Sequence, residues 1–254
     1  MCNFKHMKII IRLTILSLTI LLVNCSVCRD LNTALADPNN ITKLNLGYQD
    51  LTDLSPEIGK LKNLKTLILF KNKLETLPPE IGLLTNLETL SIGANKLRSL
   101  PPEIGDLKNL KKLFLQQNDL VELPIEIGNL SNLKQLDIKY NHLKALPGEI
   151  GKLQQLTNFY VNNNKLVSLP KEIGNMSSLQ FLNISKNQLE YIPAEIGQLY
   201  NLRELYATNA GIMCALPESI CKLRGLELLT IDGTTIIPHC LQVIINPRFR
   251  LVVQ

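Results

Sequence analysis

The sequence is poor in the residues that most often carry chemistry. It has no tryptophan, three histidines, and only 5% aromatic residues in a chain of 254. His6, His142 and His239 stand in no recognisable motif, and the chain contains no glycine-rich phosphate loop, zinc-ligand spacing or nucleophile elbow. We therefore predict a protein without enzyme activity, cofactor, metal site or small-molecule substrate.

A strong excess of one charge is also missing. The net charge is +5, but the first 24 residues contribute Lys5, Lys8 and Arg12 and no acidic residue. Of the 27 basic residues, 24 therefore remain beside 22 acidic ones in the rest of the chain. Such a nearly neutral body has no electrostatic footprint for DNA or RNA, so nucleic acid is not the expected partner.

No apolar run is long enough to cross a membrane as a helix. The run Leu13–Val23 is about half the length that a bilayer requires. Basic residues precede it and Cys25 follows it, which is the layout of a secretory signal peptide. We predict that residues 1–24 are such a segment, whether the chain starts at Met1 or at Met7.

The middle of the chain has no cysteine. The six cysteines lie near the two ends: Cys2, Cys25, Cys28, Cys214, Cys221 and Cys240. Export to an oxidising compartment favours one disulfide among the last three, and the sequence leaves the pairing open. The Cys25-x-x-Cys28 spacing has no second pair of ligands, so we expect no metal or redox role for it.

One phrase is abundant instead, Leu-x-x-Leu-x-Leu-x-x-Asn-x-Leu-x-x-Leu-Pro-x-Glu-Ile-Gly-x-Leu-x-x, which recurs every 23 residues. Its eight copies open at Ile41, Leu64, Leu87, Leu110, Leu133, Leu156, Leu179 and Leu202. A fixed period of this length predicts a stack of structural repeats, each contacting only its neighbours, rather than a closed globule.

The copy Leu64–Asn86 shows how each unit is expected to fold. Leu67 and Leu69 alternate with outward-facing residues as in a strand, and strands of neighbouring units should pair in parallel. The asparagine after each strand should satisfy backbone groups at the turn. The Pro-x-Glu-Ile-Gly segment should form a short helical turn, closed by Gly82 in the left-handed conformation.

The pattern weakens at both ends, as the caps of a repeat array require. We predict a linker and capping helix over residues 25–40, eight full repeats and a partial ninth over residues 41–236, and a C-terminal cap over residues 237–254. The predicted fold class is an α/β solenoid. A parallel β-sheet should line its concave face, and short helical or 3-10 turns its convex face.

The repeats resemble the leucine-rich-repeat superfamily. The Leu-Pro-x-Glu-Ile-Gly variant and the segment Arg29–Leu35 are similar to exported repeat proteins of pathogenic spirochaetes. The resemblance implies protein binding, with host or extracellular-matrix proteins as partners. In addition, Leu22-Val23-Asn24-Cys25 resembles the lipobox of bacterial lipoproteins, although Asn24 stands where Gly, Ala or Ser is usual. This implies lipidation of Cys25 and membrane attachment, with secretion without lipid as the alternative.

Aromatic residues gather at the outward positions of the expected strands. Seven of the twelve lie there: Tyr48 and the six predicted partner-binding residues Phe70, Phe114, Tyr140, Tyr160, Phe181 and Tyr206. Exposed aromatic side chains are favoured interface anchors, but they also suit strands and can pack on each other. Neighbouring lysines either favour an acidic partner or form a solvated flank: Lys71, Lys96, Lys139, Lys165 and Lys186.

The sequence therefore predicts an exported protein-binding scaffold whose concave face binds a protein partner. It would lie at the outer membrane or cell surface as a lipoprotein, or be secreted. The alternatives are a secreted effector that acts on a host signalling protein and a self-associating structural protein of the cell surface.

Overall fold

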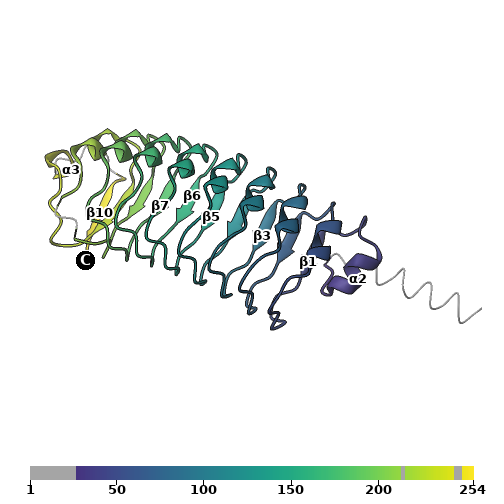
Figure 1. Ribbon diagram of the computed structural model, residues 1–254. Coiled ribbons are helices and arrows are strands. Elements are labelled where there is room, and N and C mark those ends of the chain that lie inside the picture. The colour runs from purple at the N-terminus through teal and green to yellow at the C-terminus, as the bar shows by residue number, and fades with distance from the viewer. Residues whose placement is uncertain (1–26, 213–214, 243–247) are drawn as a thin grey trace, which may run out of the picture.

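The computed structural model describes residues 27–212, 215–242 and 248–254, which form one long curved solenoid (Figure 1). The predicted signal peptide at residues 1–24 and the predicted lipidation site Cys25 lie outside the described residues, and so does Cys214.

Short parallel strands form one open sheet along the solenoid, and within the described residues there are ten of them. They are β1 (Lys43–Asn45), β2 (Thr66–Ile68), β3 (Thr89–Ser91), β4 (Lys112–Phe114), β5 (Gln135–Asp137), β6 (Asn158–Tyr160), β7 (Phe181–Asn183), β8 (Glu204–Tyr206), β9 (Leu228–Ile231) and β10 (Arg250–Val253). Equivalent residues pair from one strand to the next, so Leu67 pairs with Leu90 and Leu90 with Leu113. This register stacks the inward leucines in one continuous apolar core.

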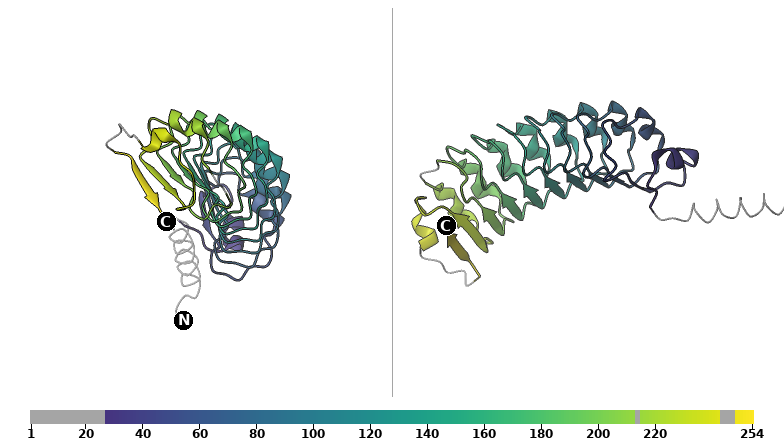
Figure 2. Two further views of the ribbon diagram at one scale, coloured as in Figure 1. Left: turned by 90° about the vertical axis from the view of Figure 1, so that its left-hand side faces the viewer. Right: turned by 90° about the horizontal axis from the view of Figure 1, so that it is seen from below.

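A 3-10 helix returns the chain from each of the first eight strands to the next. The helices are η1 (Pro56–Lys60), η2 (Pro79–Leu83), η3 (Pro102–Asp106), η4 (Ile125–Asn129), η5 (Gly148–Lys152), η6 (Lys171–Asn175), η7 (Ala194–Gln198) and η8 (Glu218–Lys222). They line the convex side and the sheet lines the concave side (Figure 2). The predicted fold class, an α/β solenoid with 3-10 turns on its convex face, is confirmed.

The asparagines that follow the strands, which we call the asparagine ladder, satisfy backbone groups at the turns, as the sequence predicted, and they also join neighbouring repeats. Asn118 is buried; its Nδ2 donates to the carbonyl oxygens of Ile92 and Leu115 at 3.1 and 3.0 Å. Its Oδ1 accepts the N–H of Leu97 at 3.0 Å. Each such side chain thus satisfies three backbone groups that the turn would otherwise bury without partners. Corresponding contacts are made by Asn72, Asn95, Asn141, Asn164 and Asn187.

The prediction of a left-handed Gly82 is wrong. Among the described glycines only Gly211 has a positive φ, and Gly82 lies buried inside η2. A Cβ at Gly82 would lie 2.7 Å from the carbonyl oxygen of Glu103 in the next repeat. Glycine is therefore required by the close stacking of the 3-10 helices, not by its backbone conformation.

The two ends of the sheet differ. At the first, the helix α2 (Leu31–Ala36) is capped by the side chain of Asp30, and Cys28 forms a parallel bridge with Leu44 of β1. At the other, β10 pairs in parallel with β9. A disulfide joins Cys221 of η8 to Cys240 of the helix α3 (His239–Gln242), with 5.9 Å between their Cα atoms.

Candidate partner-binding surface

Three of the predicted aromatic residues form one group on the concave face. The rings of Tyr160 and Phe181 lie 4.6 Å apart between centroids, and those of Phe181 and Tyr206 lie 5.1 Å apart. They come from the consecutive strands β6, β7 and β8, and all three side chains are half-buried. We call Tyr160, Phe181 and Tyr206 the aromatic cluster. Its rings pack on each other and still present surface to solvent.

The hydroxyl of Tyr206 donates a hydrogen bond to Oε2 of Glu204 at 2.8 Å. Burial raises the pKa of Tyr206, and the carboxylate of Glu204 raises it further. The hydroxyl therefore stays protonated at neutral pH, and the bond to Glu204 holds one end of the aromatic cluster in place.

The other three predicted residues lie apart from the aromatic cluster. Phe70 packs edge-on against Tyr48, with 5.7 Å between ring centroids, near the first end of the sheet. Within the described residues, Phe114 and Tyr140 contact no other aromatic ring. The six residues thus occupy one face, but they do not form one patch.

An ion pair with a buried carboxylate and a partly exposed ammonium lies beside the aromatic cluster. Asp137 of β5 is only 5% exposed, and its Oδ2 lies 3.0 Å from Nζ of Lys139. Burial raises the pKa of Asp137, and the hydrogen bond and charge of Lys139 oppose that rise. Strand alternation gives Asp137 the same orientation as Phe114 and Tyr160, its partners on the adjacent strands, and gives no sign that its side chain is buried.

Two of the lysines also lie over aromatic rings. Nζ of Lys139 is 5.7 Å from the ring centroid of Tyr160, and Nζ of Lys71 is 5.2 Å from that of Tyr48. These are cation–π distances. Lys71 and Lys139 are therefore part of the concave surface, whereas Lys96, Lys165 and Lys186 make no such contact within the described residues.

Hydrogen-bond acceptors lie beside the ion pair. Oε1 of Gln116 and Oδ1 of Asn162 are buried and accept no hydrogen bond within the described residues. Gln116 and Asn162 occupy the same place in their repeats as Lys139 does in the repeat between them. Three consecutive repeats thus carry two buried amide oxygens and one ammonium in a row, and the side chain that bears the ammonium, that of Lys139, is partly exposed.

The residue before each asparagine of the ladder has a left-handed backbone. The equivalent residues of the first and last full repeats have the same conformation. The values of φ lie between 52° and 62° for Tyr48, Lys71, Ala94, Gln117, Tyr140, Asn163, Lys186 and Asn209. No glycine marks this position, so the sequence offered no signal for it. Tyr140, which has this conformation, is 49% exposed.

Metal-ligating side chains do not gather in the described part of the chain. It contains no group of three or more His, Cys, Asp or Glu side chains placed to hold a metal ion. Nor does any helix in it combine the length and apolarity that a membrane crossing requires.

Residues 102–206 match the family described as leucine-rich repeat region. Together with the parallel sheet and its 3-10 turns, this decides the fold. The chain is a leucine-rich-repeat solenoid. No curated protein sequence matches it.

The solved structures that this chain resembles include proteins of bacteria and plants. A leucine-rich-repeat protein of Leptospira interrogans is 29% identical with a TM-score of 0.62, and the match covers 90% of this chain and 76% of that one. The plant peptide hormone receptor RGFR1, solved in complex with RGF2, is 27% identical with a TM-score of 0.74, covering 85% of this chain.

A third similar structure is the ectodomain of the Arabidopsis thaliana membrane receptor kinase GASSHO1/SCHENGEN3, in complex with CASPARIAN STRIP INTEGRITY FACTOR 2. It is 31% identical with a TM-score of 0.68, and the match covers 83% of this chain. The chain spans only 36% and 29% of the two plant receptor chains.

Proposed function

We propose that the concave face binds a protein or peptide partner and that the aromatic cluster is the anchor of the interface. The observation that carries this proposal is the contact of Tyr160, Phe181 and Tyr206 across three consecutive strands. Aromatic side chains that are packed at the base and open to solvent contribute strongly to interfaces, because their position costs little entropy to fix. In this proposal the protein binds its partner and catalyses no reaction.

The polar centre supplies specificity beside this anchor. Lys139 is held by Asp137 and so presents an oriented ammonium. The two similar plant receptors were solved as complexes with RGF2 and with CASPARIAN STRIP INTEGRITY FACTOR 2, which supports a ligand-binding role for such a surface.

The test uses a displayed library of random peptides as the probe. Peptides selected on the wild-type protein are measured by fluorescence anisotropy against Tyr160→Ala/Tyr206→Ala and against Tyr191→Ala. Tyr191 is an exposed tyrosine outside the sheet. We expect the double variant to lose at least about tenfold in affinity, and Tyr191→Ala to bind normally. Equal binding by all three proteins would overturn the proposal.

We also propose that the protein is exported and that Cys25 carries the lipid that holds it to a membrane. The proposal rests on the order of basic residues, apolar run and cysteine at the start of the chain. Mass spectrometry of the N-terminal peptide should show an acylated Cys25, and Cys25→Ser should release the protein from membranes. An unmodified first residue other than Cys25 contradicts lipidation and favours simple secretion.

Self-association is the second candidate function, and strand β10 favours it. This strand ends the described sheet, and Val252 and Val253 are exposed on it. An exposed, apolar edge strand is a template for pairing with another chain. Light scattering should then give a mass that rises with concentration in the wild type but not in Val252→Lys/Val253→Lys. A constant monomer mass in both proteins eliminates this candidate.

A further inference from the structure

The acidic side chains of the concave face are all engaged by neighbours within the protein. The third, fifth, seventh, eighth and tenth residues of each repeat form this face and its rim, and five of them are acids. Three acids lie 2.9 to 3.5 Å from a basic side chain, in the pairs Asp50–Lys73, Asp119–His142 and Asp137–Lys139. Glu204 accepts a hydrogen bond from the hydroxyl of Tyr206, and Asp232 accepts the backbone N–H of Asn209.

Six cations of the same face have no such partner. Five of them occupy the same positions of the repeats, namely Lys43, Lys96, Lys112, Lys165 and Lys186. The sixth is Arg250, the first residue of β10. All six side chains are exposed, and none of them forms an ion pair or a side-chain hydrogen bond within the described residues. The uncommitted charge of the concave face is therefore positive.

Three of these cations lie around the aromatic cluster. Lys165 follows β6 and Lys186 follows β7, so both belong to repeats that contribute a ring. Arg250 lies at the opposite end of the strands, in the row that joins Phe181 to its partners on β8 and β9. Burial raises the pKa of Tyr206, whereas the positive charge of Arg250 lowers it, so this guanidinium is close enough to act on the cluster.

The rings of the aromatic cluster leave little room for a flat ligand. Phe181 contacts a tyrosine ring on each of the neighbouring strands, and Nζ of Lys139 lies over the ring of Tyr160. A nucleic-acid base or a sugar needs a free ring face on which to stack. Because two of the three rings have a neighbour on both sides, the cluster suits an apolar side chain that packs against ring edges.

We propose that the partner of the concave face is an acidic peptide segment, which places an apolar side chain on the aromatic cluster and carboxylates on both sides of it. This inference rests on the proposed function, because it names the chemistry of the partner at the same site. Lys165 and Lys186 meet the carboxylates at one end of the strands, and Arg250 meets them at the other. Ammonium and guanidinium groups donate charge-assisted hydrogen bonds to carboxylates. Such complementarity steers the encounter and selects among partners.

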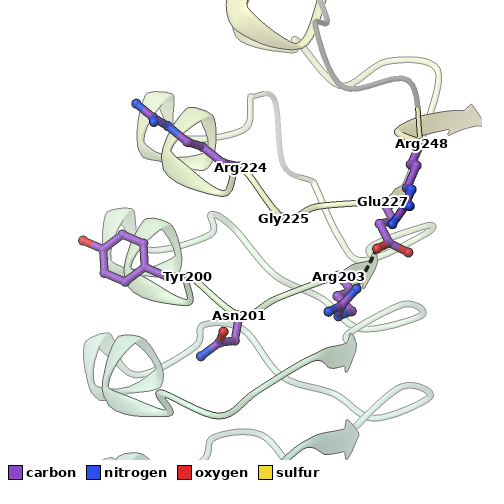
Figure 3. Close-up of a pocket in the computed structure, with 7 residues that line it drawn as sticks. All are labelled: Tyr200, Asn201, Arg203, Arg224, Gly225, Glu227 and Arg248. Atoms are coloured by element: carbon purple, nitrogen blue, oxygen red, sulfur yellow. Dashed lines mark hydrogen bonds and ion pairs between the residues drawn. The ribbon is translucent and has the colours of Figure 1, made fainter.

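The cavity beside the last repeats does not offer the same charges. It has a volume of about 410 Å³ and is lined in part by Arg203 (Figure 3). Arg203 donates to Oε1 of Glu227 at 2.7 Å, so its charge is already paired. The side chains of Tyr200 and Arg224 point away from the cavity (Figure 3). An acidic segment therefore meets uncommitted cations on the concave face rather than in this cavity.

The probes are the peptides that a displayed random library yields on the wild-type protein. Each peptide is made a second time with Asn and Gln in place of Asp and Glu. We expect the selected peptides to carry Asp or Glu on both sides of an apolar residue. In fluorescence anisotropy at low salt, Lys165→Gln/Lys186→Gln should lose about fivefold or more in affinity for the acidic peptides. The loss should shrink at about 0.5 M salt and be absent for the neutral peptides.

The matched control removes two positive charges from the convex face. Lys152 of η5 and Lys171 of η6 are exposed, and Lys152→Gln/Lys171→Gln changes the net charge of the protein by the same amount. This variant should bind the acidic peptides as the wild type does. Arg250→Gln, in contrast, should weaken their binding, because it removes the cation at the other end of the strands.

Three results would overturn the acidic partner. The first is equal affinity for the acidic and neutral peptides, and the second is an equal loss in the concave and convex lysine variants. The third is tighter binding of a single-stranded oligonucleotide than of any selected peptide. A failure of the proposed function looks different, because Tyr160→Ala/Tyr206→Ala then binds the peptides as the wild type does. If only the charge is irrelevant, that double variant still loses affinity.

Discussion

Asp137 and Lys139 are joined twice on the concave face. Oδ2 of Asp137 lies 3.0 Å from Nζ of Lys139, and its Oδ1 accepts the backbone N–H of the same residue at 3.2 Å. Both contacts favour the carboxylate, yet burial outweighs them and raises the pKa of Asp137. The pair is thus an oriented feature of the surface that costs folding free energy when it is ionised.

Because ionised Asp137 costs folding free energy, the stability of the protein is expected to depend on pH. The folded pKa of Asp137 lies above its unfolded value, so the stability that this group contributes is present below the unfolded pKa and is lost as pH rises through the folded pKa. We therefore expect Asp137→Asn, which cannot ionise, to gain stability relative to the wild type as the pH rises above the ordinary pKa of an aspartate. Urea unfolding at several pH values measures this. The exposed Asp53→Asn is the control, and a pH-independent difference for Asp137→Asn contradicts the prediction.

The asparagine ladder predicts a large loss of stability on truncation. Asn118→Ala would leave the carbonyl oxygens of Ile92 and Leu115 and the N–H of Leu97 without their partners. Each buried, unpaired group costs about 1–3 kcal/mol, so we expect a loss of at least about 3 kcal/mol in the free energy of unfolding. Gln155→Ala, at an exposed position, should change it by less than about 0.5 kcal/mol. Chemical denaturation of both variants provides the comparison.

Because the 3-10 helices stack closely, a single added methyl group is expected to destabilise the protein. In Gly105→Ala the new Cβ would lie 2.6 Å from the carbonyl oxygen of Glu126, so neighbouring repeats must separate. Overpacking of this kind costs about 1–3 kcal/mol. The matched control is Gly233→Ala, whose Cβ would have no neighbour nearer than 3.6 Å. If thermal unfolding shows the same change for both variants, steric stacking is not the role of Gly105.

At a residue with a left-handed backbone, a substitution to glycine is expected to stabilise the protein. Ala94 has φ 55°. This conformation costs an L-residue about 1–2 kcal/mol, and Ala94→Gly removes that cost. Glycine also raises the conformational entropy of the unfolded chain, which opposes this effect. A net gain of up to about 1 kcal/mol in the free energy of unfolding should remain. Ala145→Gly, outside the positive-φ positions, should instead lose stability. Destabilisation by both glycines in chemical denaturation would show that the strain at Ala94 is relieved in solution.

How far the surface could be predicted differs from residue to residue. Alternation along each strand is enough to place Tyr160, Phe181 and Tyr206 on one face, because successive side chains of a strand point to opposite sides. It could not separate them from Phe114, which contacts no ring within the described residues. Ring contact depends on side-chain directions across neighbouring strands. The spacing of the repeats is the same around Phe114 as around the aromatic cluster, so the spacing alone does not distinguish them.

The sequence by itself determined the period, the inward leucines, the asparagine ladder and the solenoid. Each of these follows from a pattern that recurs identically, so one copy predicts the others. Only the tertiary structure decided that Cys221 pairs with Cys240, that Asp137 is buried and that Gly82 is needed for stacking. These features depend on distances of a few ångströms between side chains of adjacent repeats. The 23-residue period does not specify those distances, because they change wherever a single residue departs from the pattern.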